Sequence, residues 1–325
     1  MKIGVLGGGA WGTALAQVAA RGAQPVTLWA REDDVVTSVN TAHENASFLP
    51  GVPLSPSIRA TSDLADLSDR DALLVVVPAQ FLRAVLAQLP AGNRPLVLCA
   101  KGIEAGTQKL VAEVARELHP AAPVAVLSGP TFAHEVAKGL PTAVTLACED
   151  EALRDALAER LGSPTFRTYG SSDVAGAEIG GAVKNVLAIA CGVVEGAGLG
   201  LNARAALIAR GFAEMTRFGV ARGGRPETLA GLSGLGDLVL TCSSTNSRNF
   251  SLGLGLGQGK AATELLADRR TVAEGAATAP VLREAARAAG VEMPVTEAVC
   301  ALLEGTPVRA VVDALLARPP RGESA

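Results

Sequence analysis

Hydrophobic and polar positions alternate in blocks along the first half of the chain. Short apolar runs are separated by longer stretches with helical spacing, which predicts strands alternating with helices. The run Leu73–Val77 is apolar at every position, as in a parallel strand covered on both faces. We predict strands at Ile3–Leu6, Pro25–Trp29, Ala72–Val77, Pro95–Ala100, Val124–Leu127 and Ala143–Ala147, and helices at 11–21, 32–42, 80–88, 107–118, 131–138 and 150–161.

From about residue 171 the short apolar runs stop and alanine-rich stretches with helical spacing take over. We predict helices at 174–195, 202–220, 227–241, 274–289, 294–304 and 307–317. The pattern therefore predicts an α/β protein with two domains: a doubly wound sheet over 1–170, then an all-helical domain over 171–325. Asp173 lies at the junction and suits a helix N-cap.

The first predicted strand runs directly into Gly7-x-Gly9-x-x-Gly12, and a helix-forming stretch follows at once. This order is that of a Rossmann dinucleotide-binding unit, in which the glycines permit the tight turn and the close approach of a pyrophosphate. The anion then lies at a helix N-terminus. A second set of alternating glycines, between 253 and 259, lacks a preceding strand, and we predict a flexible or tightly packed helical segment there.

Composition narrows the functional classes. The 325 residues are 49% hydrophobic but only 3% aromatic, and the net charge of −3 argues against a nucleic-acid partner. The five cysteines form no CxxC pair, which favours buried thiols in a reducing compartment and no metal site. We expect no secretory leader, because one lysine and a predicted strand stand at the start, and the longest apolar stretch, Val186–Val194, is too short to span a bilayer. We therefore expect a cytoplasmic protein without membrane insertion.

The end of the second predicted strand indicates the cofactor. An acid at this point binds the ribose 2′-hydroxyl of NAD, whereas an arginine accommodates the 2′-phosphate of NADP. The strand here is followed by Arg31 and then Glu32. Arg31 favours NADP and Glu32 weakens that preference, so we predict that NADPH is preferred and NADH remains usable. The alternative is that both are plain surface charges.

A dehydrogenase needs a proton donor beside the hydride site. The only tyrosine, Tyr169, has Asp173 where a Tyr-x-x-x-Lys pair would need lysine, and the histidines, His43, His119 and His134, have no obvious carboxylate partner. Lys184 lies in a predicted helix that is apolar on nearly all sides, where burial would lower its pKa toward neutrality. Asn185 beside it can both donate and accept hydrogen bonds. A lysine that reaches the surface along its stem is the alternative.

Two further segments carry candidate chemistry. Lys101 follows a predicted parallel strand, at the sheet edge where ligands bind, although a surface lysine would also fit. Residues 241–249 combine hydroxyls, amides and Arg248, a set suited to a phosphate, although an ordinary polar loop remains the alternative. Asp237 could pair with Lys184, bind a substrate hydroxyl or simply cap a helix.

Taken together, these segments resemble bacterial-type NAD(P)-dependent glycerol-3-phosphate dehydrogenases over nearly the whole chain. The motifs that carry the resemblance are Gly7–Ala16, Leu49-Pro-Gly51, Val77-Pro78, Lys101-Gly102, Ser128–Ala133, Lys184-Asn185, Gly231–Asp237 and Ser247-Arg-Asn249. The resemblance implies that Lys184 is the proton acceptor. It implies substrate contacts at Lys101, Gly129, Thr131, Asn185, Asp237, Ser247, Arg248 and Asn249. It implies cofactor contacts at Gly7, Gly9, Ala10, Trp11, Gly12, Arg31, Phe48, Lys101, Ala133, Arg248, Val272 and Glu274.

Three positions depart from the commoner family pattern: Ala10 replaces serine, Phe48 replaces tyrosine, and Glu32 replaces a second basic residue. The resemblance implies interconversion of dihydroxyacetone phosphate and sn-glycerol 3-phosphate with NAD(P)H, a supply of glycerol phosphate for phospholipid synthesis, and a small-molecule phosphate as the partner. We also expect a homodimer. The alternatives are a 3-hydroxyacid dehydrogenase, a ketopantoate reductase, or an NADPH-binding sensor without turnover.

Overall fold

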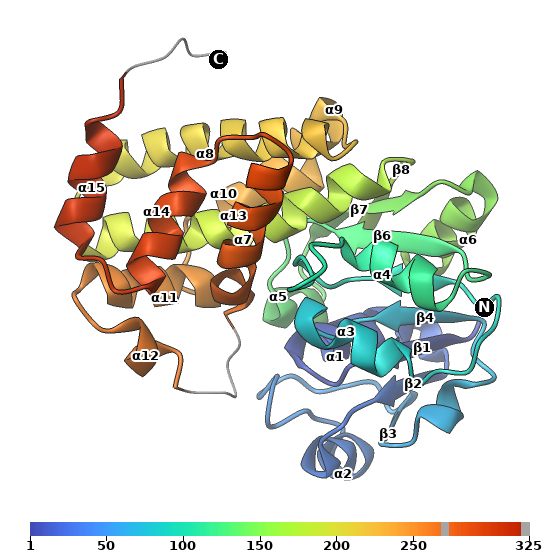
Figure 1. Cartoon of the computed structure of the whole chain (residues 1–325). Coiled ribbons are helices and arrows are strands. Elements are labelled where there is room, and N and C mark those ends of the chain that lie inside the picture. Colours follow the sequence, from blue (N-terminus) through green and yellow to red (C-terminus); the bar gives the residue numbers. More distant parts are fainter. Residues whose placement is uncertain (268–272, 320–325) are drawn as a thin grey trace.

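The computed structural model describes residues 1–267 and 273–319 and consists of a sheet-containing half and a helical half (Figure 1). The first half contains one eight-stranded sheet in the order β3-β2-β1-β4-β5-β6-β7-β8. Its strands are β1 Ile3–Leu6, β2 Val26–Trp29, β3 Ile58–Thr61, β4 Ala72–Val75, β5 Leu96–Leu98, β6 Val124–Ser128, β7 Thr142–Cys148 and β8 Phe166–Ser171. Its helices are α1 Ala10–Ala19, α2 Asp33–Ala42, α3 Ala79–Leu86, α4 Val111–Leu118, α5 Ala133–Ala137 and α6 Glu151–Leu161.

All six predicted strands are present, and the Rossmann architecture is confirmed. Two strands at the sheet edges, β3 and β8, are absent from the sequence prediction. Both carry exposed polar residues, such as Arg59 in β3 and Arg167 in β8, and therefore lack a continuous apolar run. The sheet is also not wholly parallel, because β7 pairs antiparallel with β6 while β8 runs parallel to β7.

The helical half contains α7 Val174–Gly196, α8 Leu201–Ala221, α9 Pro226–Leu229, α10 Asp237–Thr241, α11 Arg248–Gly257, α12 Ala262–Leu265, α13 Glu274–Ala288, α14 Pro294–Leu303 and α15 Val308–Leu316. The predicted single helix over 227–241 is wrong: α9 and α10 are separated by a π-helical turn, Leu232–Gly236. A Cβ at Gly234 would lie 1.9 Å from the carbonyl oxygen of Leu229, so the tight turn requires glycine there. The predicted helix over 107–118 starts only at Val111, because Gln108 adopts a positive φ of 58°.

Helix α7 is the central element of the helical half. Its N-cap is Asp173, whose side chain accepts a hydrogen bond from the amide of Gly176 at 2.9 Å. It is long and apolar enough to cross a membrane, but its most apolar window is entirely buried inside the fold, as in the core helix of a soluble protein. Figure 1 shows it leading from the end of the sheet into the helical half.

The alternating glycines between 253 and 259 lie mostly in α11; of the two predicted alternatives, a flexible or a tightly packed helical segment, the structure shows the packed helix. A Cβ at Gly253 would lie 2.0 Å from the carbonyl oxygen of Ile189, and one at Gly192 would lie 2.1 Å from that of Phe250. Backbone therefore meets backbone between α7 and α11. This close contact fixes the segment around Arg248 relative to Lys184.

Candidate active site

The glycine turn between β1 and α1 has the geometry of an anion cradle. Gly7 has a φ of +129°, and a Cβ at Gly12 would lie 1.8 Å from the carbonyl oxygen of Gly7. Gly9, the N-cap of α1, makes no side-chain cap, and a Cβ added there would meet no atom within 4 Å. Trp11 Nε1 is buried without a hydrogen-bond partner among the described residues. These features fit a dinucleotide pyrophosphate.

Asn45 holds this turn and was missed in the sequence analysis. Its fully buried Nδ2 donates to the carbonyl oxygen of Gly8 and to Thr13 Oγ1, both at 2.8 Å. Its Oδ1 accepts a hydrogen bond from the amide of Phe48 at 3.0 Å. One amide side chain therefore joins the glycine turn to the segment of Phe48. An asparagine between helix and loop carries no distinctive signal in the sequence.

Arg31 and Glu32 follow β2 at the edge where a cofactor ribose would lie. Arg31 Nη2 lies 2.7 Å from Glu32 Oε1, and the Arg31 side chain is otherwise exposed. Glu32 is also the N-cap residue of α2. A 2′-phosphate would therefore compete with a carboxylate for the guanidinium. This geometry is consistent with the prediction from the sequence that Glu32 weakens a preference for NADP.

Two lysines from different halves of the chain meet on one buried carboxylate. Asp237 is fully buried at the start of α10. Its Oδ1 accepts a hydrogen bond from Lys184 Nζ at 2.7 Å, and its Oδ2 accepts one from Lys101 Nζ at 2.6 Å. Lys101 follows β5, and its ammonium also donates to the carbonyl oxygen of Gly129, just after β6, at 3.1 Å. The cluster thus lies at the carboxyl edge of the parallel strands, as does the glycine turn after β1.

Burial adjusts the proton affinity of Lys184. The residue is only 6% exposed, and desolvation lowers its pKa to about 8, while Asp237 opposes this shift and Lys101 adds to it. The ammonium also donates to Thr241 Oγ1 at 2.9 Å. Thr241 was not singled out as a lysine partner from the sequence; it lies one helical turn after Asp237 in α10 and therefore shares that residue's contact with Lys184. The cluster can hold or release a proton near neutral pH.

Asn185 and Asn249 connect the lysine cluster to α11. Asn185 Nδ2 donates to the carbonyl oxygen of Lys101 at 3.3 Å, and its Oδ1 accepts from Asn249 Nδ2 at 3.0 Å. Ser247 Oγ caps α11 by accepting from the amide of Phe250 at 3.2 Å. Arg248 is the first residue of that helix and is exposed. A guanidinium at a helix N-terminus suits an anionic group.

Thr131 and Glu274 lie near this cluster, whereas Ala133 begins α5, which packs against α1 of the glycine turn. Thr131 Oγ1 donates to the carbonyl oxygen of Gly129 at 3.2 Å. Burial raises the pKa of Glu274, an effect opposed by the charges of Arg248, Lys101 and Lys184. Val272 lies outside the described residues.

The other candidate acid–base groups have structural roles elsewhere. His119 Nε2 contacts the carbonyl oxygen of Leu86 at 2.9 Å, and His43 ends α2 in a left-handed conformation. Tyr169 lies exposed on the edge strand β8, beneath the Arg167 guanidinium. The His134 side chain is partly exposed and stacks on Phe132, with their ring centroids 6.0 Å apart. Among these candidates, Lys184 is the one whose buried side chain contacts a carboxylate at the carboxyl edge of the sheet.

Comparison with known proteins identifies the family. The chain matches the family model for the N-terminus of NAD-dependent glycerol-3-phosphate dehydrogenase over residues 2–154, and the model for its C-terminus over 173–313. The glycerol-3-phosphate dehydrogenase [NAD(P)+] 1 of Sphingopyxis alaskensis is 65% identical over 99% of this chain and 98% of its own length. This chain belongs to the glycerol-3-phosphate dehydrogenase family.

Solved glycerol-3-phosphate dehydrogenases share the whole architecture. The crystal structure of the Coxiella burnetii enzyme is 41% identical, with a TM-score of 0.93, and the match covers 98% of this chain and 99% of that one. The Saccharomyces cerevisiae enzyme is 30% identical, with a TM-score of 0.82, over 96% and 98% of the two chains. The sheet and the helical half therefore keep the arrangement of the glycerol-3-phosphate dehydrogenase family.

Proposed function

We propose that this chain interconverts dihydroxyacetone phosphate and sn-glycerol 3-phosphate with NAD(P)H. The observation that supports this most directly is the buried carboxylate of Asp237 held between Lys101 and Lys184. It lies at the same sheet edge as an anion-binding glycine turn. The two ammonium groups that contact Asp237, those of Lys101 and Lys184, come from different halves of the chain. A keto substrate beside them would therefore meet a proton donor and a second cation together.

In this proposal Lys184 donates the proton that the substrate carbonyl oxygen receives. When bound, the reduced nicotinamide supplies the hydride for the C2 carbonyl. Lys184 gives its proton to the carbonyl oxygen, and in the reverse direction it takes the proton from the C2 hydroxyl. Since its pKa lies at about 8, both protonation states are populated near neutral pH. Asp237 and Thr241 hold the amine in place, at 2.7 and 2.9 Å.

The residues around this amine would orient the substrate. Lys101 contributes a second positive charge beside the carbonyl, and Arg248 with Asn249 at the start of α11 binds the phosphate. The further contacts in this proposal are Gly129, Thr131, Asn185 and Ser247. Fixing the phosphate end would place the carbonyl over Lys184.

The dinucleotide would lie along the edge of the sheet. The proposed contacts are Gly7, Gly9, Ala10, Trp11, Gly12, Arg31, Phe48, Lys101, Ala133, Arg248 and Glu274, with Val272 outside the described residues. Ala10 begins α1 without a side-chain donor, so the pyrophosphate would depend on backbone amides there.

A direct assay tests the activity and the cofactor preference together. Purified protein is expected to oxidise NADPH, followed at 340 nm, only after dihydroxyacetone phosphate is added, with a higher kcat/KM for NADPH than for NADH. Ketopantoate and a 3-oxo acid serve as control substrates. Turnover of a control substrate instead would favour the related reductases, and NADPH binding without turnover of any substrate would favour a sensor. NADH used as efficiently as NADPH would contradict the preference.

Replacing Arg248 by alanine is expected to raise the KM for dihydroxyacetone phosphate by roughly 10- to 100-fold while changing kcat little. The lost interaction is a charge-assisted contact to the phosphate, and such contacts are worth about 1.5–3 kcal/mol. Steady-state kinetics measure both constants. Arg309→Ala, which removes an exposed arginine from α15, is the control. An unchanged KM in the Arg248 variant would exclude a phosphate contact.

Three further features belong to the proposal. We divide the chain into a dinucleotide domain, 1–170, and a helical domain, 171–325, because β8 ends at Ser171 and α7 starts three residues later.

We infer a homodimer that buries the exposed apolar residues Leu199 and Leu201 at the start of α8, which sedimentation would test. We place the protein in the cytoplasm, where its product would serve phospholipid synthesis.

A further inference from the structure

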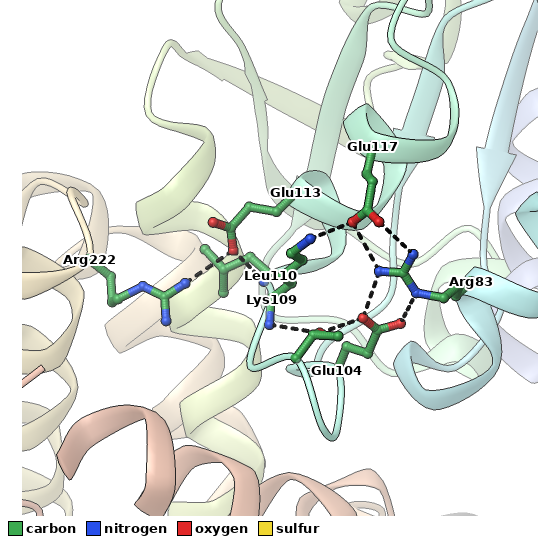
Figure 2. A network of polar contacts seen from close by, with 8 residues as sticks. Arg83, Glu104, Lys109, Leu110, Glu113, Glu117 and Arg222 are labelled. Carbon is green, nitrogen blue, oxygen red and sulfur yellow. Dashed lines mark hydrogen bonds and ion pairs between the residues drawn. The ribbon is translucent and has the colours of Figure 1, made fainter. Parts of the chain in front are cut away.

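The loop between β5 and α4 connects the active-site residue Lys101 to the ion pair of the buried Glu104 with the partly exposed Arg83. Glu104, three residues after Lys101, is 8% exposed. Its carboxylate accepts two hydrogen bonds from Arg83 on α3: Nε to Oε1 at 2.8 Å and Nη2 to Oε2 at 2.9 Å. Thr107 donates to the same Oε2. Figure 2 shows the Arg83 guanidinium between Glu104 and a second carboxylate, Glu117.

The charge on Glu104 is maintained despite its burial. The Arg83 guanidinium holds the pKa of the Glu104 carboxyl below its usual range, and the Thr107 hydroxyl adds to this effect. The pair is therefore ionic at neutral pH, with a planar guanidinium bound through two parallel hydrogen bonds. Such a geometry restricts orientation as well as distance.

Gln80 on α3 binds the backbone of the same loop through two hydrogen bonds. Gln80 Nε2 donates to the carbonyl oxygen of Ile103 at 2.7 Å, and Gln80 Oε1 accepts from the amide of Ala105 at 3.0 Å. Ile103 itself is fully buried in the apolar cluster of the helical half. The loop is thus fixed to α3 of the sheet half and inserted into the other half. Lys101, near the start of this loop, therefore extends from an anchored backbone.

The position of the Lys101 amine depends on that anchor. A lysine side chain is flexible, so its ammonium reaches Asp237 Oδ2 at 2.6 Å and the oxygen of Gly129 at 3.1 Å only from a fixed main chain. Asn185 provides the other main-chain restraint, through the carbonyl oxygen of Lys101. We propose that Glu104, held by Arg83, is a positioning residue that sets the placement of the Lys101 ammonium in the active site. This inference rests on the proposed function.

Arg83 also supplies a matched control. Its Nη1 donates to Glu117 Oε1 at 3.1 Å, but the Glu117 side chain is 44% exposed, lies on α4 and also pairs with Lys109. Glu104→Gln and Glu117→Gln therefore remove the same charge from the same arginine. Only the first loosens the segment that leads to Lys101.

Glu104→Gln is expected to lower kcat/KM for dihydroxyacetone phosphate by roughly 10- to 100-fold, because small displacements of an active-site group cost this much. Glu117→Gln is expected to stay within about twofold of the unsubstituted enzyme. Amide hydrogen exchange of residues 99–105 should rise in Glu104→Gln alone. Equal kinetic losses in the two variants, or no loss in Glu104→Gln, would overturn the proposal.

A double-mutant cycle separates positioning from general damage to the fold. In a Lys101→Ala background, Glu104→Gln should cause little further loss, because its effect passes through the missing amine. A full additional loss there would show a merely structural role and overturn the proposal. If thermal unfolding shows that Glu104→Gln does not fold, Arg83→Lys replaces it, because lysine keeps the positive charge but lacks the planar guanidinium. Arg83→Lys is then measured alone and in the Lys101→Ala background, and a full additional loss in that background would again overturn the proposal.

The proposed function and the positioning role can fail separately. An unsubstituted enzyme that does not reduce dihydroxyacetone phosphate refutes the proposed function. The exchange comparison between Glu104→Gln and Glu117→Gln needs no turnover, and unchanged exchange at 99–105 in both would overturn the anchoring role by itself.

Discussion

Lys184→Ala is expected to lower kcat for dihydroxyacetone phosphate reduction by roughly 10²- to 10⁴-fold, the usual contribution of a general acid. The amine is the buried group whose pKa, at about 8, permits proton exchange near neutrality. The fold should tolerate the change, because Asp237 keeps its ion pair with Lys101 at 2.6 Å. Steady-state kinetics give kcat, and fluorescence titration with NADPH should show unchanged cofactor binding.

Lys260→Ala, which removes an exposed lysine from the helical half, is the control and should keep full activity. The unsubstituted enzyme should also lose reductive activity as the pH rises through about 8, because Lys184 must carry the proton that it donates. A Lys184→Ala enzyme with nearly normal kcat would refute the acid–base role of this residue.

Asp237→Asn is expected to have the second largest effect. It removes the only negative charge that both lysine amines contact in this cluster as the structure describes it. Burial already lowers the pKa of Lys184, Asp237 raises it, and Lys101 lowers it further. Without Asp237 the pKa of Lys184 therefore moves below about 8. The reductive kcat/KM should begin to fall at a lower pH than in the unsubstituted enzyme, and should be roughly 10²-fold lower at pH 8.

The pH profile of kcat/KM between pH 6 and 10 measures this shift, since it reports the ionisation of the free enzyme. Removing one partner of a buried ion pair also costs about 3–5 kcal/mol in the free energy of unfolding, which denaturant titration at pH 7 measures. Asp313→Asn, on an exposed position of α15, is the control for both readouts. An unshifted profile would show that Asp237 does not control the proton affinity of Lys184.

Local signals predicted much of this molecule. The glycine turn at residues 7–12 is contiguous, so its function could be predicted before any fold was known. Lys184 stood out because a cation in an otherwise apolar helix is costly unless it is paired. Its carboxylate partner Asp237 remained one of several options, since nothing in a linear chain measures the distance between residues 53 positions apart.

The missed features depend on neighbours far apart in the sequence. The strands β3 and β8 lie at the sheet edges, where half-exposed residues carry no continuous apolar run. The antiparallel direction of β7 relative to β6 was also missed, because strand direction depends on how the chain pairs in the sheet and not on the apolar run itself. Thr241 contacts Lys184 because it lies one helical turn after Asp237 in α10, so it could be predicted only once the Lys184–Asp237 pair was known.

The order of apolar runs, the glycine spacing and the isolated lysine of an apolar helix were sufficient to predict a Rossmann half, a helical half and an enzyme that uses a nicotinamide cofactor. These are properties of neighbouring residues, and neighbours interact whatever the rest of the chain does. The convergence of Lys101, Lys184 and Asp237, and the anchoring of Lys101 through Glu104 and Arg83, were decided by tertiary structure alone. Lys101 meets Asp237 only after the helical half packs on the sheet half, and Arg83 meets Glu104 only after α3 packs beside the loop that follows β5.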